Sequence, residues 1–126
     1  MKKISIIGLG NMGSAILGTL IKTFDPKNIF VSNHDLGKLN KAQNEFDLPK
    51  QNCSIDPNEI LPKADIIMLA IKPQSFDDFA KNLTIDLKSK LVISIMAGVS
   101  IDKISKKLNT SKIIRSMPNL CLQVSM

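Results

Sequence analysis

The sequence has 126 residues, of which 44% are hydrophobic and 22% charged, with only 6 Gly and 6 Pro. This length allows one domain with its own core, and this composition excludes intrinsic disorder, collagen-like repeats and low-complexity linkers. Lys and Arg exceed Asp and Glu by 17 to 11, but Tyr and Trp are absent, and nucleic-acid bases stack on aromatic side chains. We therefore expect a lysine-rich surface and no nucleic-acid partner.

The cysteines and the amino-terminal segment bear on the compartment. Cys53 and Cys121 are isolated, and His34 is the single histidine, so we expect neither a disulfide framework nor a metal site. The apolar stretch after Lys3 is interrupted by glycines and an asparagine, unlike a signal peptide. No segment is apolar over a length that would span a membrane. The sequence therefore predicts a cytoplasmic protein without a membrane partner.

The first half of the chain alternates short apolar runs with helical periodicity. Residues 4–7 predict a buried strand, residues 29–31 a second strand, and the segment near Cys53 a short edge strand. Between the first two strands we expect a helix whose apolar stripe consists of Met12, Ala15, Ile16, Thr19 and Leu20. A second helix is expected before Pro49, with a stripe formed by Leu36, Leu39, Ala42 and Phe46.

The second half continues the alternation. Asp56 is expected to cap a helix that has Pro57 in its first position, and Glu59 to complete a capping box. Residues 66–71 and 91–95 predict strands in the middle of a sheet, and residues 113–114 the last strand. The helical stripe between the first two of these consists of Phe76, Phe79, Ala80 and Leu83. Ser100 is expected to cap a helix that carries Ile101, Ile104 and Leu108.

Alternating strands and helices with right-handed crossovers predict a fold of the α/β class. We expect a doubly wound, mainly parallel sheet in three α/β/α layers, formed by one domain over residues 1–119 and without a second domain. A short tail, residues 120–126, has apolar residues at alternate positions, which is typical of a half-buried strand. This tail is expected to add to the sheet edge or to contact a second copy of the chain.

A glycine-rich turn follows the first predicted strand and opens the first predicted helix. It reads Gly8, Leu9, Gly10, Asn11, Met12 and Gly13, a GxGxxG pattern. In this context Gly8 permits the tight turn, Gly10 allows a pyrophosphate to approach the backbone, and Gly13 allows the helix to pack closely on the strand. The N–H groups at the helix start would then bind the phosphates. The turn predicts a dinucleotide site of the Rossmann type.

The end of the second predicted strand bears on which dinucleotide is bound. Asn33 lies twenty residues after Gly13, where an NAD enzyme usually has Asp or Glu on the ribose hydroxyls. Ser32, Asn33 and His34 carry no carboxylate that would repel a 2′-phosphate, and Lys38 can reach such a phosphate from the following helix. Asp35 argues in the opposite direction. These residues favour NADP over NAD.

Four blocks, in this order, resemble pyrroline-5-carboxylate reductases. They are IGLGNMG at 7–13, AD at 64–65 leading to AIKPQ at 70–74, SIMAGVSI at 94–101 and IRSMPN at 114–119. The resemblance implies reduction of 1-pyrroline-5-carboxylate to L-proline with NADPH or NADH, the last step of proline synthesis. It also implies that further residues line the cofactor. These are Ala70, Ile71, Lys72, Pro73, Met96, Ala97 and Gly98, and Asn119 is expected to place its amide near the nicotinamide.

The sequence also departs from that family. Where family members continue with Thr-Pro-Ala, this chain has Leu120-Cys121-Leu122. Members also carry a second, helical domain that holds the substrate. We expect no such domain in this chain, so no catalytic residue is assigned. Two alternatives remain: an NADP-binding module without turnover, stand-alone or truncated, and a relative in the β-hydroxyacid dehydrogenase or imine reductase group. Residues 72–74 and 117–119 favour the pyrroline-5-carboxylate reductases over the latter group.

Overall fold

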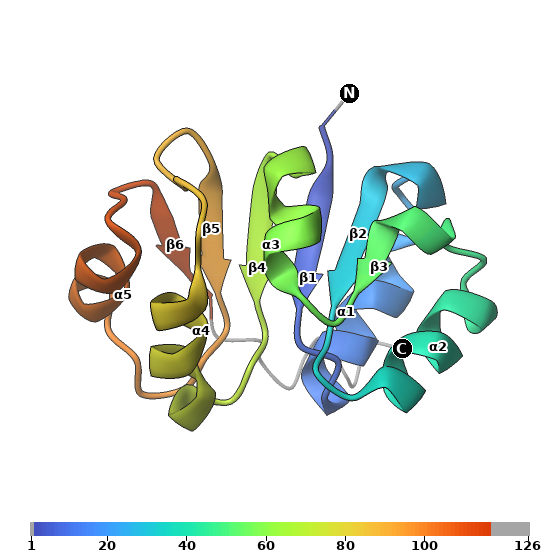
Figure 1. Ribbon diagram of the computed structural model, residues 1–126, viewed down its shortest axis with the longest axis horizontal. Coiled ribbons are helices and arrows are strands. Elements are labelled where there is room, and N and C mark those ends of the chain that lie inside the picture. The colour runs from blue at the N-terminus through green and yellow to red at the C-terminus, as the bar shows by residue number, and fades with distance from the viewer. Residues whose placement is uncertain (1, 117–126) are drawn as a thin grey trace.

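A computed structural model describes residues 2–116, which form one six-stranded sheet between two layers of helices (Figure 1). The strands are β1 (Ile4–Ile7), β2 (Ile29–Ser32), β3 (Cys53–Ser54), β4 (Ile66–Leu69), β5 (Leu91–Ser94) and β6 (Ile113–Arg115). Their order is β3-β2-β1-β4-β5-β6, and every neighbouring pair is parallel. The predicted doubly wound α/β fold is confirmed.

The helices divide between the two faces of the sheet. They are α1 (Asn11–Leu20), α2 (Leu36–Glu45), α3 (Pro57–Ile60), α4 (Phe76–Asn82) and α5 (Ile101–Leu108). In Figure 1, α3, α4 and α5 lie in front of the sheet, and α1 and α2 cover the other face. Since the chain changes faces after β3, the loops that follow β1 and β4 separate at the carboxyl edge, where ligands of such sheets bind.

Two hydrophobic clusters hold these layers together. On the front face, Ile67 and Leu69 of β4 pack with Phe76 of α4 and Ile104 of α5. On the other face, Ile4 and Ile6 of β1 and Ile29 and Val31 of β2 pack with Ile16 and Leu17 of α1. Both clusters include residues of β1, and all four residues of this strand are buried. Strand β1 therefore lies at the centre of the fold, and the glycine turn follows directly at its carboxyl end.

The buried face of α1 differs from the predicted stripe. Gly13, Ile16 and Leu17 are buried, whereas Ala15 and Thr19 are exposed. Ile16 was predicted correctly, and Met12 and Leu20 pack against the cluster from partly buried positions. The stripe is rotated toward Gly13 because that residue, which has no side chain, makes the closest approach to the sheet.

Three smaller expectations also fail. Leu36 and Ile101 are 56% and 46% exposed, since each is the first residue of its helix and only the next turn reaches the core. The capping box at Glu59 is not formed, because the N–H of Asp56 donates to Ser54 Oγ (3.0 Å). Asp56 nevertheless caps α3 by accepting from the N–H of Asn58 (3.0 Å).

The strands predicted at 66–71 and 91–95 end at Leu69 and Ser94. Beyond those residues the chain bends into the loops at the carboxyl edge. The predicted domain end at residue 119 and the tail 120–126 lie outside the described residues. Within residues 2–116, no helix is long and apolar enough to cross a membrane.

Candidate functional site

The glycine turn is shaped by close contacts between backbone segments. Gly8 has a φ of +103°, and a Cβ at this position would lie 2.8 Å from the carbonyl oxygen of Ala70. Only glycine adopts this backbone conformation without strain. The N–H of Gly8 donates to the carbonyl oxygen of Ser32 (2.9 Å), so the turn begins at a fixed point above the ends of β1, β2 and β4.

Helix α1 begins at this turn without a side-chain cap. Its N-cap is Gly10, and no side chain of the described chain accepts a hydrogen bond there, whereas Asp35 caps α2 and Ser100 caps α5. A Cβ at Gly10 would have no atom within 4 Å. The first intrahelical bond runs from the N–H of Ser14 to the carbonyl oxygen of Gly10 (2.9 Å). The N–H groups of residues 11–13 precede it, and the positive end of the helix dipole is open to an anion.

Asn33 connects the glycine turn to the loop after β2. It is buried (6% exposed); its Oδ1 accepts from the N–H of Leu9 (3.0 Å), and its Nδ2 donates to the carbonyl oxygen of Asp35 (3.1 Å). Both polar groups of the side chain are thus used within the protein. The N–H of Leu9 is used as well, and the Leu9 side chain is buried in the core.

A cavity of about 390 Å³ lies over this turn, and we refer to it as the loop cavity. Gly8 and Gly10 form one side of it, His34, Asp35 and Lys38 the second, and Ala70, Ile71 and Lys72 the third. Asp35 Oδ1 accepts from the N–H of Lys38 (3.2 Å), so this carboxylate is engaged at the start of α2.

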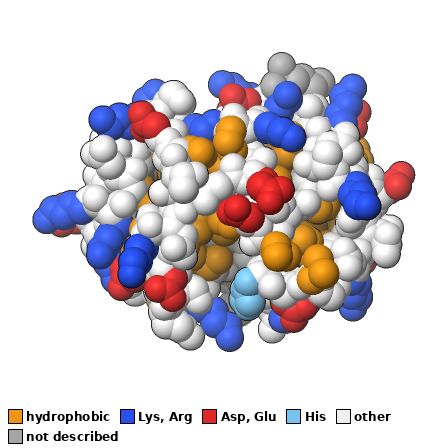
Figure 2. Space-filling model, in the orientation of Figure 1, with side chains coloured by type: hydrophobic (Ala, Val, Ile, Leu, Met, Phe, Trp, Pro, Cys, Tyr) orange, Lys and Arg blue, Asp and Glu red, His pale blue; other side chains and the backbone are white. Residues whose placement is uncertain are grey.

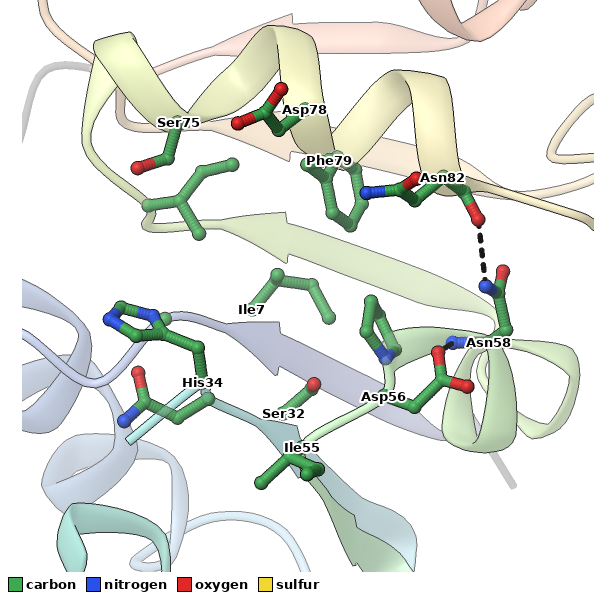
Figure 3. Close-up of a pocket in the computed structure, with 14 residues that line it drawn as sticks. Ile7, Ser32, His34, Ile55, Asp56, Asn58, Ser75, Asp78, Phe79 and Asn82 are labelled. Carbon is green, nitrogen blue, oxygen red and sulfur yellow. Dashed lines mark hydrogen bonds between the residues drawn. The ribbon is translucent and has the colours of Figure 1, made fainter. Parts of the chain in front are cut away.

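A second cavity of about 340 Å³, the front cavity, continues from the loop cavity between α3 and α4 (Figure 3). Asn33, His34, Ile71 and Ser75 line both. In Figure 3, Ser75, Asp78 and Phe79 approach from α4 and the turn before it, and His34, Ile55 and Asp56 from the opposite side. In Figure 2, hydrophobic side chains gather beside this hollow, with acidic side chains and the histidine on its rim.

Asn58 closes the far end of the front cavity. Its Nδ2 donates to the carbonyl oxygen of Asn82 (2.9 Å), and its Oδ1 accepts from the N–H of Thr84 (2.9 Å) (Figure 3). One side chain of α3 therefore holds the carboxyl end of α4 at a fixed distance. The two cavities together form one groove that runs from the start of α1 to Asn58.

The structure brings together many of the predicted site residues. The groove is lined by Gly8, Leu9, Gly10, Ser32, Asn33, His34, Lys38, Ala70, Ile71 and Lys72. Asn11 lines a neighbouring cavity with Lys38. Met12, Gly13, Pro73, Ala97 and Gly98 line neither cavity of the groove, and the Met96 side chain is 2% exposed within the front cluster. Asn119 lies outside the described residues.

Several lining residues were missed by the sequence reasoning, among them Ile55, Asn58, Ser75, Asp78 and Asn82. Ile55 directly follows β3 at the carboxyl edge, which is the signal that would have identified it. Phe79 was predicted only as a core residue, but it belongs to the front cluster and also lines the front cavity. Among residues 2–116, no group of three metal-ligating side chains occurs.

The comparisons with known proteins agree with this geometry. Residues 3–98 match the family model described as "NADP oxidoreductase coenzyme F420-dependent". The chain belongs to this family. It is 39% identical over 122 residues to the pyrroline-5-carboxylate reductase of Escherichia coli (strain K12), covering 94% of this chain and 44% of that protein. The resemblance inferred from the four sequence blocks is thereby confirmed.

Solved structures give the same result. A pyrroline-5-carboxylate reductase from Coxiella burnetii superposes with a TM-score of 0.85 at 33% identity, over 98% of this chain and 46% of that one. A pyrroline carboxylate reductase from Plasmodium falciparum, solved with NADP bound, superposes with a TM-score of 0.75 at 30% identity, over 98% and 44%. This chain thus spans less than half the length of these relatives.

Proposed function

We propose that this chain binds NADP(H) and forms the cofactor-binding part of a reductase that converts 1-pyrroline-5-carboxylate to L-proline. The observation that carries the proposal is the groove that begins at the uncapped start of α1 and continues into the front cavity. The similarity to pyrroline-5-carboxylate reductases at 39% identity supports the choice of substrate.

The residues of the groove fit a dinucleotide. The N–H groups of residues 11–13 would hold the pyrophosphate, since they have the helix dipole behind them and open space at Gly10. The front cavity would take the adenosine between Ile55, Ile71 and Phe79, because a flat, largely apolar ring gains most from an apolar slot with a few polar groups at its rim.

NADP is the preferred form in this proposal. The last residue of β2 and the two that follow it carry no carboxylate, and Asp35, which comes next, uses Oδ1 to cap α2 by accepting from the N–H of Lys38. Lys38 is exposed and lines the loop cavity, where its ammonium group would attract a 2′-phosphate. His34, also exposed at this end, is a second candidate contact.

The bound cofactor would supply a hydride, and the chain's own residues would orient it. Ala70 directly follows β4, and the segment at 96–98 follows β5 at the same carboxyl edge, where the nicotinamide half would lie. Met96 can contribute only through its backbone, because its side chain is in the core. Hydride transfer requires the cofactor and the imine carbon in near-attack geometry. We also propose that the protein is cytoplasmic and that copies of the chain contact each other through residues 120–126.

Titration of the purified chain with NADPH, followed by nucleotide fluorescence, tests binding. A turnover assay with pyrroline-5-carboxylate then tests the reaction. NADPH binding is the expected result for the cofactor-binding part, and proline formation in addition would show that this chain alone completes the reaction. Binding without turnover would favour an NADP-binding module, and turnover of another imine alone would favour an imine reductase. Failure to bind either NADPH or NADH would reject the proposal.

A further inference from the structure

We propose that Asn33 is a positioning residue that holds the two sides of the cofactor groove in register, and that it is not a ligand of the 2′-phosphate. This inference rests on the proposed function, and it reassigns a residue that the sequence placed at the cofactor. The evidence is the burial of the side chain (6% exposed) and its two hydrogen bonds, to the N–H of Leu9 and to the carbonyl oxygen of Asp35.

The two partners require opposite chemistry from one side chain. The N–H of Leu9 needs an acceptor, and the carbonyl oxygen of Asp35 needs a donor. A primary amide supplies both. A carboxylate would satisfy Leu9 and place a negative oxygen about 3 Å from the Asp35 carbonyl oxygen, which is repulsive. The backbone groups around residue 33 therefore suffice to explain its identity as asparagine.

Each hydrogen bond fixes one side of the groove. The bond to Leu9 fixes the backbone position of the residue before Gly10. It thereby fixes the direction in which the first turn of α1 presents its N–H groups. The bond to Asp35 fixes the residue that caps α2 and accepts from the N–H of Lys38. Through Asn33, the pyrophosphate side and the Lys38 side of the loop cavity keep a constant separation.

If Asn33 holds both sides of the groove, dinucleotide binding should show it. Loss of Asn33 should weaken every dinucleotide that spans the groove, whether or not it carries a 2′-phosphate. A direct ligand of the 2′-phosphate would affect NADPH alone. In addition, an acid at this position would improve NADH binding if its side chain reached the ribose hydroxyls.

The experiment measures the Kd values of NADPH and NADH for the parent, Asn33→Ala and Asn33→Asp. The control is Asn52→Ala, since Asn52 is also buried and donates two hydrogen bonds, to the carbonyl oxygens of Lys27 and Ile29, at the opposite end of β2. We expect Asn33→Ala to weaken NADPH and NADH about tenfold each, with their ratio unchanged. Asn33→Asp should also weaken both, and NADPH more strongly, because the new carboxylate repels the 2′-phosphate. The control should lose a similar amount of thermal stability and bind both as the parent does.

A loss confined to NADPH, or tighter NADH binding by Asn33→Asp, would overturn this role, as would unchanged Kd values. Should Asn33→Ala fail to fold, the nearly isosteric Asn33→Asp decides alone. If the parent chain binds neither dinucleotide, both the proposed function and this role of Asn33 are rejected. If the parent binds both dinucleotides, the variants test the role of Asn33 independently of the proposed function.

Discussion

Gly13 and Gly8 approach each other so closely that a Cβ at Gly13 would lie 2.1 Å from the carbonyl oxygen of Gly8. The same Cβ would lie 3.3 Å from the Cβ of Ala70. The first turn of α1 thus packs directly against the carboxyl ends of β1 and β4. This contact sets how far the start of the helix stands from the carboxyl edge.

The contact predicts that Gly13→Ala destabilises the fold. The added methyl group would meet a backbone carbonyl, which cannot move without shifting β1 or α1. Overpacking of this kind costs about 1–3 kcal/mol, and we expect a corresponding fall in the urea midpoint. The matched control is Gly18→Ala, whose Cβ would meet only the Phe46 ring, at 3.9 Å, and which should be neutral or stabilising.

Gly10 should behave in the opposite way. A Cβ there has no neighbour within 4 Å and φ is −69°, so Gly10→Val is expected to fold and to lose only about 1 kcal/mol of unfolding free energy, the cost of a poorer N-cap residue. Its side chain would occupy the space through which the pyrophosphate approaches, and NADPH binding should be lost. A variant that binds NADPH with the parent's Kd would show that the phosphates bind elsewhere.

Lys38 should discriminate between the two dinucleotides. Lys38→Met removes the charge at the loop cavity while keeping an extended side chain, and we expect a loss of about tenfold for NADPH and no change for NADH. Lys22→Met, just beyond the opposite end of α1, serves as the control for net charge. Equal losses for both dinucleotides would contradict a role at the 2′-phosphate.

Ile55 should contribute apolar contact to the adenosine. It is 55% exposed, so Ile55→Ser should hardly change the stability of the free chain. Loss of this wall of the front cavity is expected to weaken NADPH about threefold to tenfold, from roughly 25 cal/mol per Å² of buried apolar surface. Ile101→Ser, at a similarly exposed isoleucine that lines neither cavity, is the control. Unchanged binding by Ile55→Ser would place the adenosine outside the front cavity.

Cys53 should react slowly with alkylating agents. Burial raises the pKa of its thiol to about 11, which reduces the thiolate fraction at pH 7.5 roughly a hundredfold or more relative to an exposed cysteine. Iodoacetamide labelling followed by peptide mass analysis should therefore show slow modification in the native chain and fast modification in urea. The folded state holds the thiol proton more tightly than the unfolded state. The contribution of this thiol to the free energy of unfolding should therefore be fully present below about pH 8.5 and decrease as the pH approaches 11.

The order of elements was predictable because each carries a local signal. Apolar runs such as residues 66–71 identified the strands, although that strand ends at Leu69, and Asp56 with Pro57 identified the start of α3. The orientation of α1 was not predictable from periodicity, because Gly13 makes the closest contact and has no hydrophobic side chain to count. Helix faces that pack through glycine are therefore displaced from the stripe that an apolar pattern predicts.

Some features of the site were likewise predictable from the sequence and others were not. The glycine turn is encoded locally, and its geometry followed from the sequence. The two hydrogen bonds of Asn33 were not predictable, because its partner Leu9 is 24 residues away and the contact exists only once β1 and β2 are paired. Similarly, nothing near Asn58 in the sequence indicates that it holds the end of α4.

The central place of β1 has a consequence for biosynthesis. This strand is synthesised well before β4, yet one of its edges pairs only with β4, and Ser5 Oγ donates to the carbonyl oxygen of Ile66, 61 residues later. Until β4 has been made, a nascent chain would present the bare edge of an apolar strand, which is a template for aggregation. Interrupted translation before residue 69 should thus yield insoluble products or chaperone substrates.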